Sequence, residues 1–223
     1  MTGITERLEA LRATLPEGVA LVAISKYHPA DAIAEAYAAG QRRFGENHIL
    51  EMAEKAATLP ADIEWHFTGH VQTNKLKHMA SFVHTIQSVD SWRLLCEIER
   101  HAARYDRVIR CLLQVHIAQE ETKYGLTPDA LMALLTDNPW RALRHVRITG
   151  LMAMASHTDD AAQVQKEFAQ VQALFKEVKS RFFADDDAFG TLSEGMTDDY
   201  MLAIAEGANM VRIGSAIFGE RVY

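Results

Sequence analysis

The chain alternates short apolar runs with amphipathic helical stretches from one end to the other. The runs favour β-branched residues and lie at 19–25, 43–45, 63–67, 82–86, 108–117, 146–152, 189–192 and 209–213. Helical patterns occupy 4–14, 29–39, 47–57, 72–80, 91–103, a stretch from 127 onward, 159–182 and 198–206. About eight βα units without a Pro-, Gly- or Ser-rich linker predict a (β/α)8 TIM-type barrel, preceded by an extra N-terminal helix. We therefore expect residues 1–223 to form a single domain.

A doubly wound open sheet is the alternative architecture. Such sheets usually have fewer strands, and their first βα turn is rich in glycine. The sequence contains neither a G-x-G-x-x-G motif nor a Walker loop, so dinucleotide and P-loop binding find no support. The barrel is the better prediction.

Composition excludes several classes of partner. The formal net charge of -7 argues against nucleic acid and against an anionic membrane surface. The N-terminus lacks a signal-peptide pattern, and no stretch is apolar enough to span a bilayer, which predicts a cytoplasmic protein. The scattered histidines form no recognisable metal-binding motif, so we expect no bound metal. We also expect the protein to be a monomer.

Lys26 is the first candidate functional residue. It follows the apolar run 19–25 directly, and the ends of the strands carry the chemistry in such barrels. Desolvation there would lower the pKa of the lysine and leave a neutral amine able to attack a carbonyl. The alternative is a lysine that simply extends to solvent from a strand end.

Two segments late in the chain have the composition of a phosphate site. Ser193, Gly195 and Thr197 follow the seventh run, while Gly214 and Ser215 follow the eighth. Barrels frequently bind phosphate with these last two loops and a short helix. Each segment alone also fits an ordinary turn with a helix cap. Together with Lys26 they indicate a phosphate-bearing aldehyde held as a Schiff base.

Seven segments carry a resemblance to a known family. They lie at 22–26, 44–47, 65–75, 123–125, 150–152, 192–197 and 211–221, in the family's order and over nearly the whole chain. The chain resembles the pyridoxal phosphate (PLP) homeostasis proteins. These are single-domain barrels of PLP fold type III, related to the N-terminal domain of alanine racemase.

The resemblance implies a role for each matching residue. It implies that Lys26 carries PLP as a Schiff base and that Arg212 faces the pyridine nitrogen. It further implies that Asn47 lies beside the cofactor ring and that the remaining cofactor-binding residues are Met152, Ser193, Gly195, Thr197, Gly214 and Ser215.

The sequence departs from the family pattern at several positions. His48 and Leu50 stand where the family has Tyr and Gln after Gly-Glu-Asn, and His116 replaces an Asn at the end of the fifth strand. Glu194 stands where the family has Met, which would place a carboxylate close to a phosphate dianion.

Arg212 points to a binding role rather than catalysis. Arginine only donates hydrogen bonds, so it favours a neutral pyridine nitrogen, which takes up carbanion charge poorly. Alanine racemase adds a tyrosine base from a second domain, whereas this sequence ends at Tyr223 directly after the last strand and its short helix. We expect a protein that stores PLP and delivers it within the cell, with little or no catalysis. The expected acceptors are apo PLP-dependent enzymes.

Two alternatives remain at this point. The first is a fold-type III amino-acid racemase-like enzyme, in which Lys26 would be catalytic. The second is an aldolase that forms a Schiff base without PLP, because aldolase substrates also carry phosphates.

Overall fold

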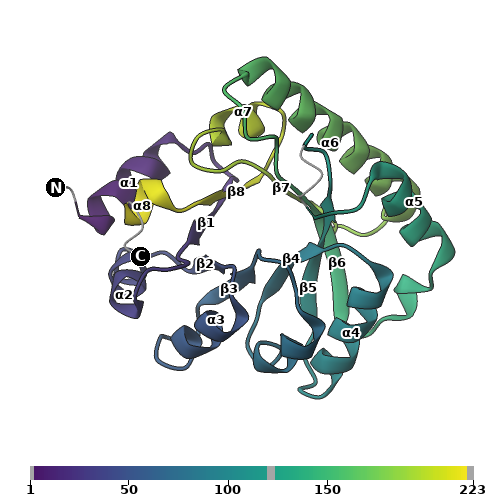
Figure 1. Ribbon diagram of the computed structural model, residues 1–223, viewed down its shortest axis with the longest axis horizontal. Helices are drawn as coiled ribbons and strands as arrows, with labels where there is room; N and C mark the ends of the chain where they lie inside the picture. Colours follow the sequence, from purple (N-terminus) through teal and green to yellow (C-terminus); the bar gives the residue numbers. More distant parts are fainter. Residues whose placement is uncertain (1–2, 120–123, 220–223) are drawn as a thin grey trace.

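Eight parallel strands close into a barrel in the computed structural model, which describes residues 3–119 and 124–219 (Figure 1). The strands run in chain order around the barrel, and β8 pairs with β1 through Ala20–Met210 and Val22–Arg212. Their bounds are β1 (Ala20–Ile24), β2 (Arg43–Glu46), β3 (Glu64–Phe67), β4 (Thr85–Val89), β5 (Ile109–Val115), β6 (Val146–Ala153), β7 (Thr191–Ser193) and β8 (Met210–Ile213). The predicted barrel is confirmed.

Helices surround the barrel on its outside (Figure 1). They are α1 (Ile4–Thr14), α2 (Ala30–Ala38), α3 (Ile49–Ala56), α4 (Trp92–Ala103), α5 (Pro128–Asp137), α6 (Ala161–Phe182), α7 (Tyr200–Ala205) and α8 (Ser215–Phe218), with 3-10 turns η1 (Thr73–His78) and η2 (Trp140–Ala142). The extra helix α1 buries Leu8 and Leu11 and packs against α2 and α8. Arg7 donates to the carbonyl of Ile217 at 2.6 Å, which joins the two ends of the chain. Among the described residues, no helix combines the length and the apolar character needed to cross a bilayer.

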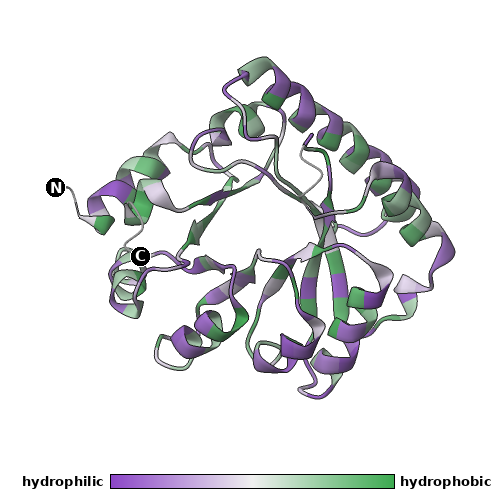
Figure 2. Ribbon diagram, viewed as in Figure 1, coloured by the Kyte–Doolittle hydropathy of each residue, from purple (hydrophilic) through white to green (hydrophobic). Residues whose placement is uncertain are grey.

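Apolar side chains fill the layer between barrel and helices, while several polar ones face the barrel interior. Phe44, Phe67 and Ile98 are fully buried in this layer, and the helices turn polar residues outward (Figure 2). Gln87 and Ser193 are fully buried as well, although both are polar. Burying polar groups is costly unless they are hydrogen-bonded, so each must have partners inside the barrel.

Two strands begin later than the sequence predicts. The prediction of 82–86 for the fourth strand was shifted, because Phe82 and Val83 belong to a turn that packs on the core. The prediction of 189–192 for the seventh strand started too early, since Phe189 stacks on Phe183 at 4.2 Å outside the strand. The helix predicted at 72–80 is the shorter 3-10 turn η1. An apolar residue packs equally well in a turn, so hydrophobicity alone did not mark these starts.

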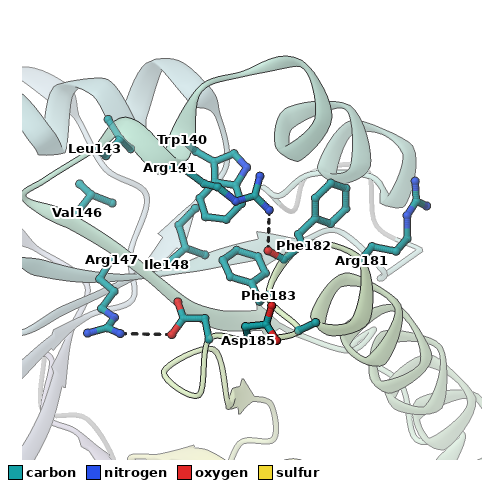
Figure 3. A pocket seen from close by; sticks show the side chains of 12 residues that line it. Trp140, Arg141, Leu143, Val146, Arg147, Ile148, Arg181, Phe182, Phe183 and Asp185 are labelled. Atoms are coloured by element: carbon teal, nitrogen blue, oxygen red, sulfur yellow. Dashed lines mark hydrogen bonds and ion pairs between the residues drawn. The ribbon is translucent and has the colours of Figure 1, made fainter.

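A hollow of about 510 Å³ lies on the flank of the barrel between η2, the start of β6 and the end of α6. Arg141 donates to the carbonyl of Phe182 at 2.8 Å (Figure 3), and Arg147 forms an ion pair with Asp186 at 3.3 Å. The hollow lies at the N-terminal end of β6, whereas barrel enzymes carry their chemistry at the C-terminal ends. We do not regard it as the functional site.

Candidate functional site

Lys26 lies at the C-terminal mouth of the barrel, two residues beyond the last residue of β1. It is half-buried between Ser25, which is fully buried, and Tyr27, which is 44% exposed. Tyr27 has a φ of 67°, a conformation uncommon for residues other than glycine. The chain thus turns sharply at the lysine, which supports the predicted position at a strand end.

A second lysine holds the backbone on which Lys26 sits. The buried ammonium of Lys55 donates to the carbonyl of Ser25 at 2.9 Å, to Glu46 at 2.7 Å and to Glu51 at 2.6 Å. Glu51 in turn accepts from the N–H of Tyr27 at 2.7 Å. All three donors of the ammonium have acceptors, and both neighbours of Lys26 are held. We call Lys55, Glu46 and Glu51 the lysine clamp.

Glu46 is the buried anion of the lysine clamp. Its Oε1 accepts from Lys55 and from the hydroxyl of Ser25, both at 2.7 Å. Burial raises the pKa of Glu46, while Lys55 and Ser25 oppose that change. The structure therefore gives this strand-end carboxylate a structural role, as the partner of a nearby base.

Asn47 lies beside the mouth, at the end of the neighbouring strand β2. Its Oδ1 accepts from the Thr68 hydroxyl at 2.7 Å, which orients the amide. Together with Tyr27, His48 and His70 it lines a cavity of about 530 Å³. His48, one of the departures from the family pattern, contacts the Tyr27 hydroxyl through Nε2 at 2.9 Å.

Arg212 reaches from β8 to the ends of β6 and β7 inside the barrel. Its Nη1 donates to the carbonyl and the hydroxyl of Ser193, both at 2.8 Å, and its Nη2 donates to the carbonyl of Ala153 at 2.9 Å. Burial lowers the pKa of Arg212 to about 10, so the guanidinium stays charged at neutral pH. Buried Met152 pairs with Ser193 in register and lies on the same face of the sheet.

Two hydroxyls meet at the mouth, above the ends of β7 and β8. The Ser215 hydroxyl donates to that of Thr197 at 3.1 Å. A Cβ on Gly214 would lie 3.1 Å from the carbonyl oxygen of Ile24, so this turn lies close to the end of β1. The structure thus brings Thr197, Gly214 and Ser215 to the strand end that carries Lys26.

Other parts of the first predicted phosphate loop are engaged elsewhere. The Ser193 hydroxyl lies inside the barrel, where it donates to Gln87 at 2.7 Å. The N–H of Met196 donates to Asp199 at 2.6 Å. Gly195 has a φ of 84°, and an added Cβ would lie 2.7 Å from the Cα of Tyr200 on α7. Glycine is therefore required there by the turn and by packing against α7.

Glu194 is buried and faces neither solvent nor a hydrogen-bond partner. It is 0% exposed, and both carboxylate oxygens lack a hydrogen bond within residues 3–119 and 124–219. Burial raises its pKa to about 8, with Arg212 opposing the rise. A carboxyl group with this pKa is mostly protonated at neutral pH, which limits its repulsion of a nearby phosphate.

Sequence reasoning missed Lys55 and Glu51, and it placed Gln87 at a strand end without assigning it a function. The i,i+4 spacing of Glu51 and Lys55 on one helix could have indicated an ion pair. Nothing in the sequence showed that the ammonium of Lys55 would be buried and would hold the carbonyl of Ser25, next to Lys26. Gln87 directly follows the apolar run 82–86, and only its partners in the closed barrel reveal its function. Two further departures from the family pattern are His116, which contacts the carbonyl of Ala118 through Nε2 at 3.0 Å, and Leu50, which is exposed. Of the resemblance segments, positions 123, 220 and 221 lie outside the described residues.

Comparisons with known proteins identify the family of the chain. The family model of the alanine racemase N-terminal domain matches residues 2–222. A PLP homeostasis protein of Pasteurella multocida is 38% identical over 216 residues, covering 95% of this chain and 91% of that protein. The chain belongs to the PLP homeostasis protein family. The Escherichia coli family member is 35% identical over 215 residues, which are 93% of this chain and 88% of that one.

Solved structures extend the comparison. PipY of Synechococcus elongatus, determined with PLP bound, is 40% identical with a TM-score of 0.87, and the match covers 97% of this chain and 100% of PipY. Alanine racemase of Clostridium difficile matches with a TM-score of 0.74 at 15% identity, covering 98% of this chain and 56% of that one. The racemase match shows a shared barrel fold.

Proposed function

We propose that this single-domain chain binds PLP and serves intracellular vitamin B6 homeostasis by storing the cofactor and delivering it. The observation that carries the proposal is the position of the hydrogen-bonded hydroxyls of Thr197 and Ser215 next to the end of β1, which Lys26 follows by two residues. Family membership and PLP-bound PipY support it. We further propose that the chain acts as a cytoplasmic monomer and that apo PLP-dependent enzymes accept the cofactor.

The residues at the mouth fit the chemistry of PLP. When bound, PLP supplies an aldehyde that condenses with a primary amine and a ring that withdraws electrons. Lys26 would provide the amine, held by the lysine clamp, and Asn47 and Met152 would border the ring. Arg212, a donor only, suits a neutral pyridine nitrogen.

We assign the phosphate to Thr197, Gly214 and Ser215. Gly195 shapes this loop, while the Ser193 hydroxyl supports Arg212 from inside the barrel. Hydroxyl donors and short helix starts form charge-assisted hydrogen bonds with a phosphate.

Covalent trapping tests the proposed function. Borohydride reduction of protein incubated with PLP, followed by peptide mass mapping, should place the adduct on Lys26. Lys26→Ala should lose the absorption band near ~420 nm expected of a PLP–lysine adduct and keep its circular dichroism spectrum. An adduct confined to another lysine would contradict the assignment, and exposed Lys77→Ala is the matched control.

The phosphate assignment makes a second prediction. Because charge-assisted hydrogen bonds contribute about 1.5–3 kcal/mol each, Thr197→Val with Ser215→Ala should weaken PLP at least tenfold. Unphosphorylated pyridoxal should bind almost as before. Ser193→Ala should instead weaken both ligands alike, since its hydroxyl contacts Arg212, and exposed Ser180→Ala should change neither. Equal loss of both ligands in the Thr197/Ser215 variant would refute the assignment.

Arg212 supports binding with little catalysis. We expect slow exchange of the alanine Cα deuteron and transfer of PLP to an added apo-enzyme. Turnover of any amino acid near ~10 s⁻¹, an ordinary enzyme rate, would instead favour a racemase-like enzyme.

A further inference from the structure

A second polar cavity lies at the opposite, N-terminal mouth of the barrel. Its volume is about 300 Å³. Most of its polar lining side chains come from β2, β3, β5, β6 and β7 and from the segment directly before β4, and they include Arg43, Glu64, His66, Arg110, Thr149 and Thr191. The proposed PLP site lies beyond the other ends of these strands, so the cavity is separate from it.

A chain of hydrogen bonds determines which ring nitrogen of His66 carries the proton. Arg212 only donates, so the Ser193 hydroxyl accepts from it and donates its own hydrogen bond to Gln87 Oε1 at 2.7 Å. The Gln87 amide nitrogen then donates both to His66 Nδ1, at 2.8 Å, and to the Met210 sulfur, at 3.5 Å. With Nδ1 accepting, the neutral imidazole carries its proton on Nε2.

This N–H of His66 has no acceptor. Nε2 is buried and lacks a hydrogen-bond partner within the part of the chain that the structure describes, and the residue is 1% exposed. Leaving a buried donor unpaired is costly, and native structures rarely do so without a reason. A ligand that supplies an acceptor atom would remove this cost.

The charges around the cavity favour an anion. Arg43 is paired with Glu64 at 2.8 Å, while the exposed guanidinium of Arg110 forms no side-chain hydrogen bond or ion pair with the described residues. Two arginines and one carboxylate leave a formal charge of +1. Ring nitrogens of His66 and His84 lie within 4.8 Å of a Glu64 oxygen, a grouping that also suits a metal ion. The proton on Nε2 and the two arginines argue against the metal.

We propose that this cavity binds a small oxyanion, such as phosphate, sulfate or a carboxylate. The anion is attracted by Arg110 and Arg43, and it accepts from Nε2–H of His66 when the side chains that cover this buried atom move aside. The hydroxyls of Thr149 and Thr191 at the cavity wall provide further donors.

Calorimetric titration tests the proposal. Phosphate, sulfate and acetate are titrated separately into the protein at saturating PLP, which keeps the proposed phosphate site of the other mouth filled. We expect saturable binding of at least one anion, weakened about tenfold by Arg110→Gln. Arg93→Gln removes the same charge from the exposed face of α4 and should leave binding within about twofold. Absence of saturable binding, or equal binding to Arg110→Gln and the wild type, would overturn the proposal.

The variant Glu64→Gln distinguishes anion binding from metal binding in this cavity. Loss of this carboxylate should tighten anion binding, because it frees Arg43 and raises the local charge, whereas it should weaken a metal that uses Glu64 as a ligand. Binding of Zn²⁺ that is lost in Glu64→Gln, without any anion binding, would refute the proposal. Histidine 15N–1H correlation spectra of the ligand-free protein should show the His66 proton on Nε2, and this resonance should shift when the anion is added. A proton on Nδ1 would remove the donor and contradict the inference.

Discussion

Lys55→Met should lower the free energy of unfolding by about 3–5 kcal/mol at pH 7, because it leaves buried Glu46 without its cation. For a domain of this size that corresponds to a fall in Tm of roughly 10 °C. The carbonyl of Ser25 also loses a donor, so Lys26 should become mobile and PLP should bind more weakly. Thermal and urea unfolding followed by circular dichroism measure the loss.

The pH dependence identifies Glu46 as the cause. Burial already raises the pKa of Glu46, and removing Lys55 removes the largest influence that lowers it. A carboxyl with a raised folded-state pKa contributes stability at low pH that is lost as pH rises. The defect of Lys55→Met should therefore shrink at pH 5, and Glu46→Gln should partly rescue it at pH 7. Lys77→Met, at an exposed position of η1, should change stability little. A Lys55→Met protein as stable as the wild type at pH 7 would disprove the role of the lysine clamp.

Glu194→Met should make the protein more stable at pH 8.5 by about 3–5 kcal/mol. The pKa of Glu194 is raised by burial to about 8, against about 4.5 for an exposed carboxyl, so the folded state holds a proton that the unfolded state releases between these values. The stability that this proton contributes is fully present below about pH 4.5, declines between about pH 4.5 and 8, and is lost above about pH 8. Methionine carries no such proton and avoids burying a charge.

The effect of Glu194 is measured as the difference in the free energy of unfolding between the wild type and Glu194→Met at each pH. The free energies of unfolding of wild type and variant should differ little near pH 4.5 and diverge steadily toward pH 8.5. Glu54→Gln, an exposed position on α3, should run parallel to the wild type. If the free energy of unfolding of Glu194→Met also depends on pH as that of the wild type does, the prediction is wrong, because the Glu194 carboxyl group must then have a partner or reach solvent. PLP affinity near pH 8.5 should rise in the variant, since an ionised Glu194 would repel the phosphate.

The order of strands and the position of Lys26 could be predicted from the sequence. Parallel barrel strands are buried on both faces, so they read as continuous apolar runs such as Val19–Ile24, and their ends are marked by the first polar residues. The same pattern placed Ser215 and Thr197 in adjacent loops, and the structure brings these two hydroxyls together. The starts of β4 and β7 were misplaced because Phe82 and Phe189 pack in turns.

The sequence pattern by itself determined the barrel, the lysine at its mouth and the hydroxyls of the last two loops, because periodicity and strand ends are local properties of the chain. Only the tertiary structure decided which polar groups meet. Lys55 reaches Ser25 across 30 positions, and Gln87 joins Ser193 across 106. Such pairings depend on the closure of the barrel, which brings distant strands together in an interior where every polar group requires a partner. For the same reason, the sequence alone could show neither that Glu194 is buried nor that His66 carries an unpaired proton at the opposite mouth.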